Sequence, residues 1–311
     1  MEYNALGKTG LKLSKLSYGA SPLGGVFRNI SEQDGIKTVH TALDLGINHI
    51  DVSPYYGLTV AETVLGKALK TVPRDKYILS TKAGRYGSDF ADFDFSAKRI
   101  RKSLDESLSR LQVDGVDILY LHDIEFGNLQ QVFDESIPCL MDLKKEGKVR
   151  YIGVTGYPIK IFAETIKQFD IDCILTYCRY ALHDTALETL IPELDIKGVG
   201  IINASPTAMG VLTSRGAPEW HPAHKDMLAA GAKAVEYCKQ KGIDITQVAL
   251  QFAIDHPSIT STLVGTANPA NIEKNVKWAQ SKADPELIAT LRGFFDGIPN
   301  TWPSGHAKYQ D

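Results

Sequence analysis

A short apolar segment followed by an amphipathic one recurs about every 30 to 40 residues along this chain, eight times in all. This alternation predicts βαβ units, in which parallel strands are joined by helices that cover the sheet. The expected strands are residues 16–19, 49–51, 77–82, 117–122, 151–154, 173–176, 200–203 and 262–264. The expected helices are residues 32–45, 61–70, 96–111, 129–146, 158–168, 185–197, 246–255 and 269–280. No other feature limits the possible folds as strongly.

Eight such units without a linker or a change in composition favour a closed (β/α)8 TIM barrel, an α/β fold, in a single domain spanning residues 1–311. An open, doubly wound sheet remains the alternative. Turn residues predict an N-terminal β-hairpin at 6–14. Long irregular stretches at 86–95 and 205–227 should project from the C-terminal face of a barrel, where active sites form. The tail at 297–311 contains Trp302, which could fold over the same face.

Charge and composition favour small-molecule chemistry. The 311 residues carry a formal net charge of −3, without any block of like charges, so neither nucleic acid nor a membrane is an expected partner. The four cysteines lack Cys-x-x-Cys spacing and are expected to be reduced core thiols. The N-terminal residues do not resemble a signal peptide, and the longest apolar runs are too short to cross a membrane. These features predict a cytoplasmic protein.

Four polar residues stand at or just beyond the C-terminal ends of three successive expected strands: Asp51, Tyr56, Lys82 and His122. A barrel brings neighbouring strand ends together, so the four side chains should converge. A lysine ammonium close to the tyrosine hydroxyl favours the phenolate, and an aspartate can hold that lysine charged. A histidine can polarise a substrate oxygen, either as a neutral or as a positive donor. Together these groups suit the interconversion of a carbonyl and an alcohol.

None of these side chains can accept a hydride, so an oxidoreductase would need an organic cofactor. The sequence has no Gly-x-Gly-x-x-Gly after the first expected strand and no P-loop motif, so neither a Rossmann half nor a P-loop is indicated. Each of the four residues taken singly also allows a structural role, such as a helix cap for Asp51.

Around these residues the chain resembles the aldo-keto reductases over nearly its whole length. Three ordered segments carry the resemblance: residues 46–57, residues 108–114 continuing through 117–122, and residues 147–155. The resemblance implies a (β/α)8 barrel, an NAD(P) cofactor on its C-terminal face, and a catalytic tetrad of Asp51, Tyr56, Lys82 and His122. Tyr56 is the match to the catalytic tyrosine because it precedes Gly57, whereas Tyr55 matches a neighbouring wall residue.

The resemblance also implies a set of cofactor contacts. Thr155 matches a residue that holds the carboxamide, but Gly156 replaces the family's usual asparagine. Tyr177 stands where a glutamine is common, and Ala204 stands where an aromatic residue often stacks on the nicotinamide. The remaining implied contacts are Ser205, Pro206 and Thr207 for the pyrophosphate, and Gly265, Thr266, Asn271 and Asn275 for the adenosine. Members that prefer NADPH carry Lys and Arg at the places of Gly265 and Asn271, so the neutral residues here favour NAD.

Loop sequences such as residues 53–57, 122–127, 218–223 and 301–305 resemble the family's sugar 1-dehydrogenases, which act on L-galactose, L-fucose or D-arabinose. The implied reaction is oxidation of an aldose at C1 to the aldonolactone. Besides Tyr56 and His122, the candidate substrate contacts are Arg85, Asp123, His183, Trp220 and His221. A zinc pair at His221 and His224 is not expected, since the loop offers no further ligand. The rival functions are an NADPH-dependent aldehyde or ketone reductase and a non-catalytic, cofactor-binding regulatory subunit.

Overall fold

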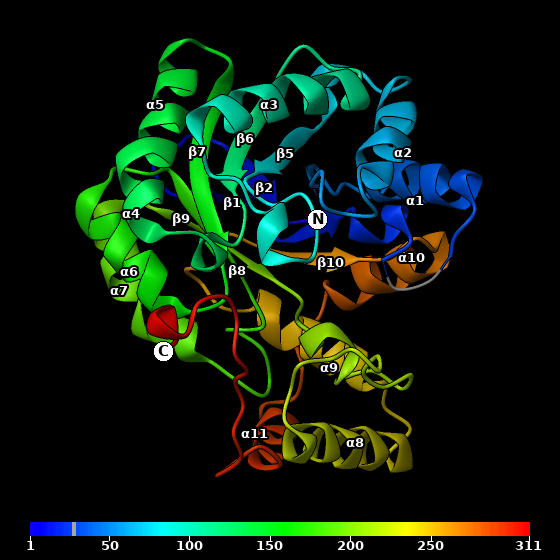
Figure 1. Cartoon of the computed structure of the whole chain (residues 1–311). Coiled ribbons are helices and arrows are strands. Elements are labelled where there is room, and N and C mark those ends of the chain that lie inside the picture. Colours follow the sequence, from blue (N-terminus) through cyan, green and yellow to red (C-terminus); the bar gives the residue numbers. More distant parts are fainter. Residues whose placement is uncertain (27–28) are drawn as a thin grey trace.

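The computed structural model describes residues 1–26 and 29–311. Its centre is a closed barrel of eight parallel strands in the order β3-β4-β5-β6-β7-β8-β9-β10, with β10 paired back to β3. Helices surround the strands (Figure 1). The (β/α)8 barrel predicted from the sequence is therefore confirmed, and the open sheet is excluded.

All eight barrel strands match the expected ranges or differ from them by two residues or fewer at each end. The strands are β3 (Leu16–Gly19), β4 (His49–Asp51), β5 (Ile78–Ala83), β6 (Val116–Leu121), β7 (Val149–Gly156), β8 (Cys173–Tyr177), β9 (Gly200–Ala204) and β10 (Ser261–Gly265). Most of their residues are buried, as in a parallel sheet that is covered on both faces.

The helices that follow the strands have recognisable sequence boundaries. Ser96 caps α3 by accepting a hydrogen bond from the backbone N–H of Arg99, and Gly198 ends α7 with a φ of 66°. The helices are α1 (Glu32–Asp44), α2 (Val60–Leu69), α3 (Ala97–Leu111), α4 (Leu129–Gln131), α5 (Ile137–Lys145), α6 (Ile159–Gln168), α7 (Ile191–Lys197), α8 (Lys225–Gln240), α9 (Ile245–Ile254), α10 (Pro269–Trp278) and α11 (Pro285–Gly293).

Two expected helices are interrupted, and in both a proline explains the interruption. The helix expected at 129–146 contains a π-helical segment, Val132–Ser136, between α4 and α5. Pro138 lacks an N–H and its ring crowds the preceding turn, so the regular α-helical bonding fails there. The helix expected at 185–197 is a 3-10 turn, Ala186–Thr189, followed by α7, which carries Pro192 in its first turn.

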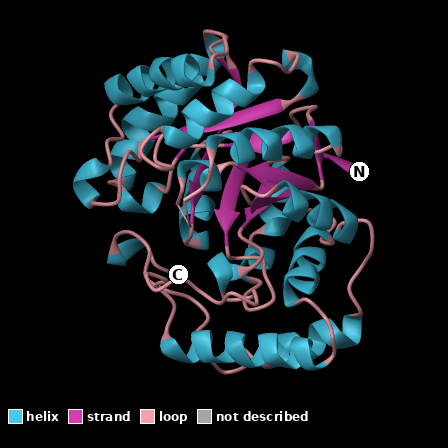
Figure 2. Ribbon diagram, turned by 90° about the vertical axis from the view of Figure 1, so that its right-hand side faces the viewer, coloured by secondary structure: helices cyan, strands magenta, loops and turns pink. Residues whose placement is uncertain are grey.

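Two helices lie outside the repeating pattern and were not predicted. α8 and α11 pack together at one end of the molecule, beyond the ring of helices (Figures 1 and 2). The ring of Tyr237 in α8 lies 5.7 Å from that of Phe294, just after α11. Because α8 begins at Lys225, the irregular stretch after β9 is slightly shorter than the sequence suggested.

The N-terminal hairpin closes one end of the barrel. β1 (Tyr3–Ala5) pairs antiparallel with β2 (Lys12–Ser14), so the predicted hairpin is confirmed, although its first strand starts earlier than expected. Three hairpin leucines join barrel residues in one buried cluster: Leu6, Leu11, Leu13, Ile118, Tyr120, Cys173, Leu175, Ile202 and Leu263. This packing fills the N-terminal end, which leaves the opposite face for a site.

The C-terminal tail runs from α11 past the barrel to the start of α6 (Figure 1). The Asp311 carboxylate accepts hydrogen bonds from the backbone N–H groups of Ile159 and Lys160, and it forms an ion pair with Arg179 at 2.7 Å. Trp302 is buried and stacks on Tyr157, with ring centres 4.7 Å apart. Within the described part of the chain, none of the helices has the length and apolarity needed to span a membrane.

Candidate active site

The pairing of β4 with β5 brings Asp51 and Lys82 together. Asp51 is directly opposite Ser80, and Lys82 lies two residues further along β5 on the same side of the strand. The Nζ atom of Lys82 donates a short hydrogen bond to Asp51, and it donates to the Val52 carbonyl at 3.0 Å. Ser80 donates to the other Asp51 oxygen at 2.6 Å. Both charges are therefore buried as a fully hydrogen-bonded pair.

Tyr56 reaches the same point from the loop after β4. Its hydroxyl accepts a hydrogen bond from Lys82 Nζ at 3.3 Å. The next residue, Gly57, has a φ of 61°, and a Cβ atom there would lie 2.2 Å from the Gly24 carbonyl oxygen. The loop can pass this close to Gly24 only without a side chain, which explains the glycine after the tyrosine.

The protonation state of Tyr56 differs from the expectation. Burial raises the pKa of Tyr56, and the lowering effect of the Lys82 ammonium does not outweigh it. Burial also opposes the charge on Lys82, but Asp51 and Tyr56 together raise the pKa of the lysine. Lys82 therefore stays charged, while Tyr56 in this structure is a neutral phenol rather than a phenolate.

His122 directly follows β6 and completes the group of four. Its ring lies edge-on to that of Tyr56, with centres 5.7 Å apart. Its Nδ1 is 3.0 Å from the Ser53 hydroxyl, and its Nε2 is 3.6 Å from an Asp123 oxygen. Burial lowers the pKa of His122 to about 3, assisted by Lys82 and Arg85 and opposed by Asp123. Of the two states considered above, the structure favours the neutral donor.

An ion pair forms the wall next to His122. Arg85 donates to Asp123 at 2.6 Å, and its guanidinium lies 3.8 Å from the centre of the Tyr55 ring. Asp123 also accepts a hydrogen bond from the Thr155 hydroxyl at 3.0 Å. Burial opposes the charge on Asp123, but His122, Arg85 and Thr155 hold the pKa of this carboxyl below its ordinary value.

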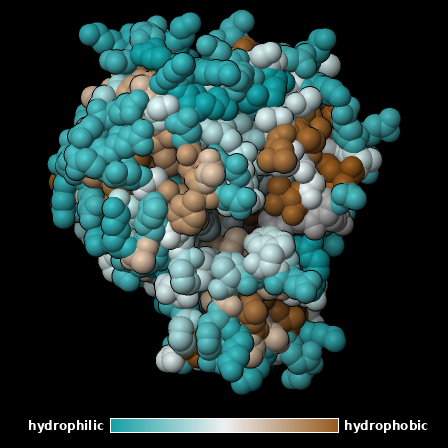
Figure 3. Space-filling model, viewed as in Figure 1, coloured by the Kyte–Doolittle hydropathy of each residue, from teal (hydrophilic) through white to brown (hydrophobic). Residues whose placement is uncertain are grey.

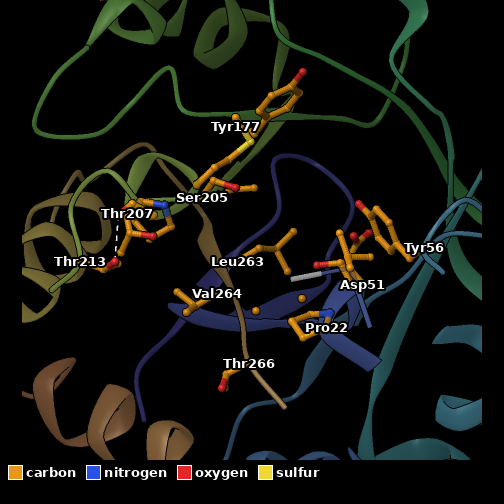
Figure 4. Close-up of a pocket in the computed structure, with 18 of the residues that line it drawn as sticks. Pro22, Asp51, Tyr56, Tyr177, Ser205, Thr207, Thr213, Leu263, Val264 and Thr266 are labelled. Carbon is orange, nitrogen blue, oxygen red and sulfur yellow. Dashed lines mark hydrogen bonds between the residues drawn. The ribbon is translucent and has the colours of Figure 1, made fainter. Parts of the chain in front are cut away.

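These residues line one end of an elongated cavity of about 820 Å³ at the C-terminal face of the barrel. A hollow is visible near the centre of that face (Figure 3). In the close-up, Asp51 and Tyr56 lie on one side of the cavity, and Ser205 and Thr207 lie across from them (Figure 4). All nine residues implied as cofactor contacts line this cavity: Thr155, Tyr177, Ser205, Pro206, Thr207, Gly265, Thr266, Asn271 and Asn275.

The cavity wall has features that suit a dinucleotide. The loop after β9 contains three non-glycine residues with positive φ, namely Ser205 at 57°, Ala208 at 49° and Met209 at 49°. Such strained backbone is concentrated at ligand sites, and turns of this kind aim N–H groups at anions. Beyond this loop the cavity continues to Thr266 and Asn271, which are joined by a hydrogen bond at 3.2 Å. The residues that line the cavity therefore fit a nicotinamide dinucleotide cofactor.

Gly156, where the family's usual asparagine is missing, lies against a buried carboxyl. A Cβ atom at Gly156 would be 2.3 Å from Ile161 Cδ1 and 2.6 Å from Glu125 Oε2, so a larger residue there would require these two side chains to shift. Glu125 accepts hydrogen bonds from the Tyr157 N–H at 2.9 Å and from the Ser304 hydroxyl at 2.8 Å. Burial, with a smaller contribution from Asp123, raises the pKa of Glu125 to about 8. The Glu125 carboxyl thus fastens the tail beside the cavity as a neutral group.

The candidate substrate contacts divide into two groups. Arg85, Asp123 and Trp220 line the cavity. His221 is not among the lining residues, because its Nε2 bonds to the Ala208 carbonyl at 3.1 Å and its Nδ1 accepts from the Ala223 N–H at 3.1 Å. The structure therefore does not place His221 on the cavity wall. His183 is also buried and does not line the cavity, and it stacks beside Trp302, which does.

Several residues at the site were missed by sequence reasoning. Ser80 and Ser53, which contact Asp51 and His122, were not singled out, although Ser53 lies within the segment 46–57 that carries the resemblance. Arg215 and Lys274 also line the cavity. Lys274 falls within the segment that matches the adenosine site, so its charge was a signal that could have been used.

Comparisons with known proteins agree with the family resemblance seen in the sequence. A model of the aldo/keto reductase family matches residues 15–295. The chain is 49% identical to L-galactose dehydrogenase from Arabidopsis thaliana, covering 98% of both chains, and 29% identical to D-threo-aldose 1-dehydrogenase from a Pseudomonas species, covering 92% of this chain and 95% of that one. An aldo-keto reductase from Bacillus halodurans, solved in a holo form, shares the fold with a TM-score of 0.80 at 24% identity and full coverage of both chains. The chain belongs to the aldo/keto reductase family.

Proposed function

We propose that this protein oxidises an aldose at C1 to the aldonolactone with NAD as the hydride acceptor. The observation that carries the proposal is the Arg85–Asp123 ion pair in the cavity wall beside Tyr56 and His122. A sugar ring needs several donors and acceptors around it, and this pair offers both next to the reacting groups. The named relatives, L-galactose dehydrogenase and D-threo-aldose 1-dehydrogenase, support L-galactose as the first candidate, with L-fucose and D-arabinose next.

In this reaction Tyr56 first loses its hydroxyl proton to solvent, and the phenolate then takes the proton of the C1 hydroxyl while hydride leaves C1. The Lys82 ammonium, 3.3 Å from the Tyr56 oxygen, stabilises the negative charge that this requires. Asp51 and Ser80 hold Lys82 charged and in place. His122 donates a hydrogen bond to the same substrate oxygen and keeps it oriented. Bound NAD would accept the hydride, held by Thr155 and Tyr177 near the tetrad and by Ser205–Thr207 further out.

The choice of NAD rests on the neutral Gly265 and Asn271 at the adenosine end of the cavity. One observation favours the second candidate, an NADPH-dependent aldehyde or ketone reductase. Arg215 and Lys274 are exposed, line the cavity, and could pair with a 2′-phosphate. We favour NAD because neither position matches the two where the family's NADPH-preferring members carry charge. A cytoplasmic location is part of the same proposal, since the four cysteines are buried and unpaired.

A panel of aldoses assayed with NAD and with NADP tests the proposal. We expect the highest kcat/KM for L-galactose or a sugar that shares its configuration, with NAD at least about tenfold better than NADP, a difference of about 1.4 kcal/mol. Turnover confined to NADPH and simple aldehydes would instead establish the reductase. If the protein binds the cofactor but turns over neither aldoses nor aldehydes, a non-catalytic regulatory subunit would be favoured.

A further inference from the structure

Ser53 is a buried serine in the loop after β4 that has no role in the mechanism above. It lies between Asp51 and Tyr56 in the sequence, and its hydroxyl is hydrogen-bonded to His122. Its hydroxyl oxygen is 3.0 Å from His122 Nδ1, and it accepts a hydrogen bond from the backbone N–H of Tyr55 at 3.1 Å. Ser53 has no exposed surface and does not line the cavity.

The direction of the Ser53–His122 hydrogen bond follows from these contacts. A serine hydroxyl has one proton to donate and two lone pairs. One lone pair already accepts from the Tyr55 N–H. Among the described residues, His122 Nδ1 is the one acceptor within hydrogen-bond distance of the hydroxyl proton. The proton is therefore directed to Nδ1, which then carries a lone pair and no proton.

The contacts of Nε2, on the other side of the His122 ring, independently indicate that the ring proton is on Nε2. Nε2 lies 3.6 Å from an Asp123 oxygen, and Asp123 is held ionised by Arg85 and Thr155. A carboxylate only accepts hydrogen bonds, so it favours a protonated Nε2 and would repel a lone pair there. Because burial keeps the ring neutral, it has a single proton to place.

We propose that Ser53 is a positioning residue that fixes His122 as the tautomer with its proton on Nε2, the nitrogen on the cavity side. Asp123 assists from that side of the ring. In the reverse tautomer, Nε2 would present a lone pair to the lone pairs of the substrate oxygen, and the hydrogen bond to C1–O would be lost. The inference rests on the proposed function for its consequence in catalysis, but the tautomer itself does not depend on the substrate.

The tautomer is read directly by NMR on the full chain labelled with ¹⁵N-histidine, without substrate. Protonated and unprotonated ring nitrogens differ widely in ¹⁵N chemical shift, and a His122→Gln variant identifies the His122 signals by their loss. We expect one neutral species with protonated Nε2 between pH 6 and 9. A protonated Nδ1, or an imidazolium that persists to pH 7, would overturn the inference.

Replacement of the serine tests its part in holding the ring. Ser53→Ala should move the Nδ1 shift toward that of a lone pair without a hydrogen bond and lower kcat for the aldose about tenfold, with KM for NAD unchanged. Ser53→Thr keeps the hydroxyl and should restore the Nδ1 shift. Ser14→Ala is the matched control, since Ser14 is an equally buried, hydrogen-bonded serine at the closed end of the barrel.

The outcomes separate the two proposals. An unchanged Nδ1 shift and an unchanged kcat in Ser53→Ala would show that Ser53 does not hold the ring. If the wild-type spectrum and the Ser53→Ala shift come out as expected while none of the sugars is oxidised, the proposed function fails and the tautomer assignment stands. If the variants do not fold, the wild-type spectrum alone still decides between protonated Nε2 and protonated Nδ1.

Discussion

The Lys82 ammonium lies 3.3 Å from the Tyr56 hydroxyl oxygen and 4.9 Å from the centre of the same ring. Among the described residues, Lys82 is the positive group that lowers the pKa of a phenol that burial raises. Lys82→Met should therefore raise the pKa of Tyr56 further. We expect aldose oxidation at pH 8 to fall at least about 100-fold and to recover in part as the pH rises, since the wild-type rate should itself increase with pH.

A kcat against pH profile from 7 to 10 measures this effect. Lys67→Met, which breaks an exposed ion pair with Glu32, is the control and should leave the profile unchanged. A Lys82→Met profile that is lowered uniformly, with no displacement along the pH axis, would assign Lys82 a role other than tuning Tyr56.

Tyr56→Phe removes the proton acceptor and leaves most of the ring packing in place. Because the phenol contributes proton transfer rather than cofactor affinity, NADH should bind as in the wild type while turnover falls at least about 100-fold. Fluorescence titration with NADH and a steady-state assay give the two quantities. Near-normal turnover would refute the role of Tyr56.

Positive charge can be introduced at positions 265 and 271, at the proposed adenosine end of the cavity. Asn271 is exposed and its amide donates to Thr266 Oγ1, so Asn271→Arg should fit without rearrangement. Gly265→Lys is tighter, since its Cβ would lie 3.1 Å from the Pro22 ring. We expect Asn271→Arg alone to shift the kcat/KM ratio toward NADP, and the double variant to shift it further. The reading of this pocket would be wrong if neither variant changed the ratio.

Arg85 and Arg99 offer a matched pair of substitutions. Each guanidinium lies 3.8 Å from the centre of a tyrosine ring, that of Arg85 over Tyr55 and that of Arg99 over Tyr86. Only Arg85 lines the cavity, so Arg85→Met should raise KM for the aldose about tenfold or more, with KM for NAD unchanged. Arg99→Met should affect thermal stability alone. Equal effects of the two changes on KM would place the sugar elsewhere.

Glu125 should make stability depend on pH. Its pKa is raised from 4.5 to about 8 in the folded chain, so the native carboxyl binds a proton that the unfolded chain releases. The stability that this group contributes is fully present below about pH 4.5. It falls by up to about 1.4 kcal/mol for each pH unit until about pH 8, where the native carboxyl also ionises.

Glu125→Gln keeps the side-chain oxygen that accepts from Tyr157 and Ser304 and removes the titration. Thermal unfolding of both proteins at pH 5, 6.5 and 8 tests this expectation. The melting temperature of the variant should rise relative to that of the wild type as the pH increases, whatever their difference at pH 5. Parallel curves would mean that Glu125 is already ionised in the folded protein.

The features that sequence predicted best are those in which residues act in a repeating or shared pattern. The eight strands were located because buried parallel strands are apolar on both faces, and the tetrad because its members end such strands. The proline interruptions at 138 and 192 were readable in principle, since proline marks the start of a helix far more often than its middle. α8 and α11 were missed because they lie outside the strand–helix repeat.

Contacts that depend on a single side-chain orientation were not predictable. Ser53 and Ser80 look like ordinary serines in the sequence, and only coordinates place one on His122 and the other on Asp51. The protonation state of Tyr56 was also not predictable from the sequence. The attraction of Lys82 could be foreseen from the positions of the two residues at neighbouring strand ends, but the opposing effect of burial depends on how completely the cavity walls exclude water.

The hairpin that fills the N-terminal end of the barrel has a kinetic consequence. Because the barrel is closed at that end, cofactor and sugar should both enter and leave from the C-terminal face, where the cavity lies. Whichever molecule lies deeper has to arrive first and depart last, which imposes a compulsory order on the two. Product-inhibition patterns should therefore be those of an ordered mechanism rather than a random one, and they would reveal which ligand is the inner one.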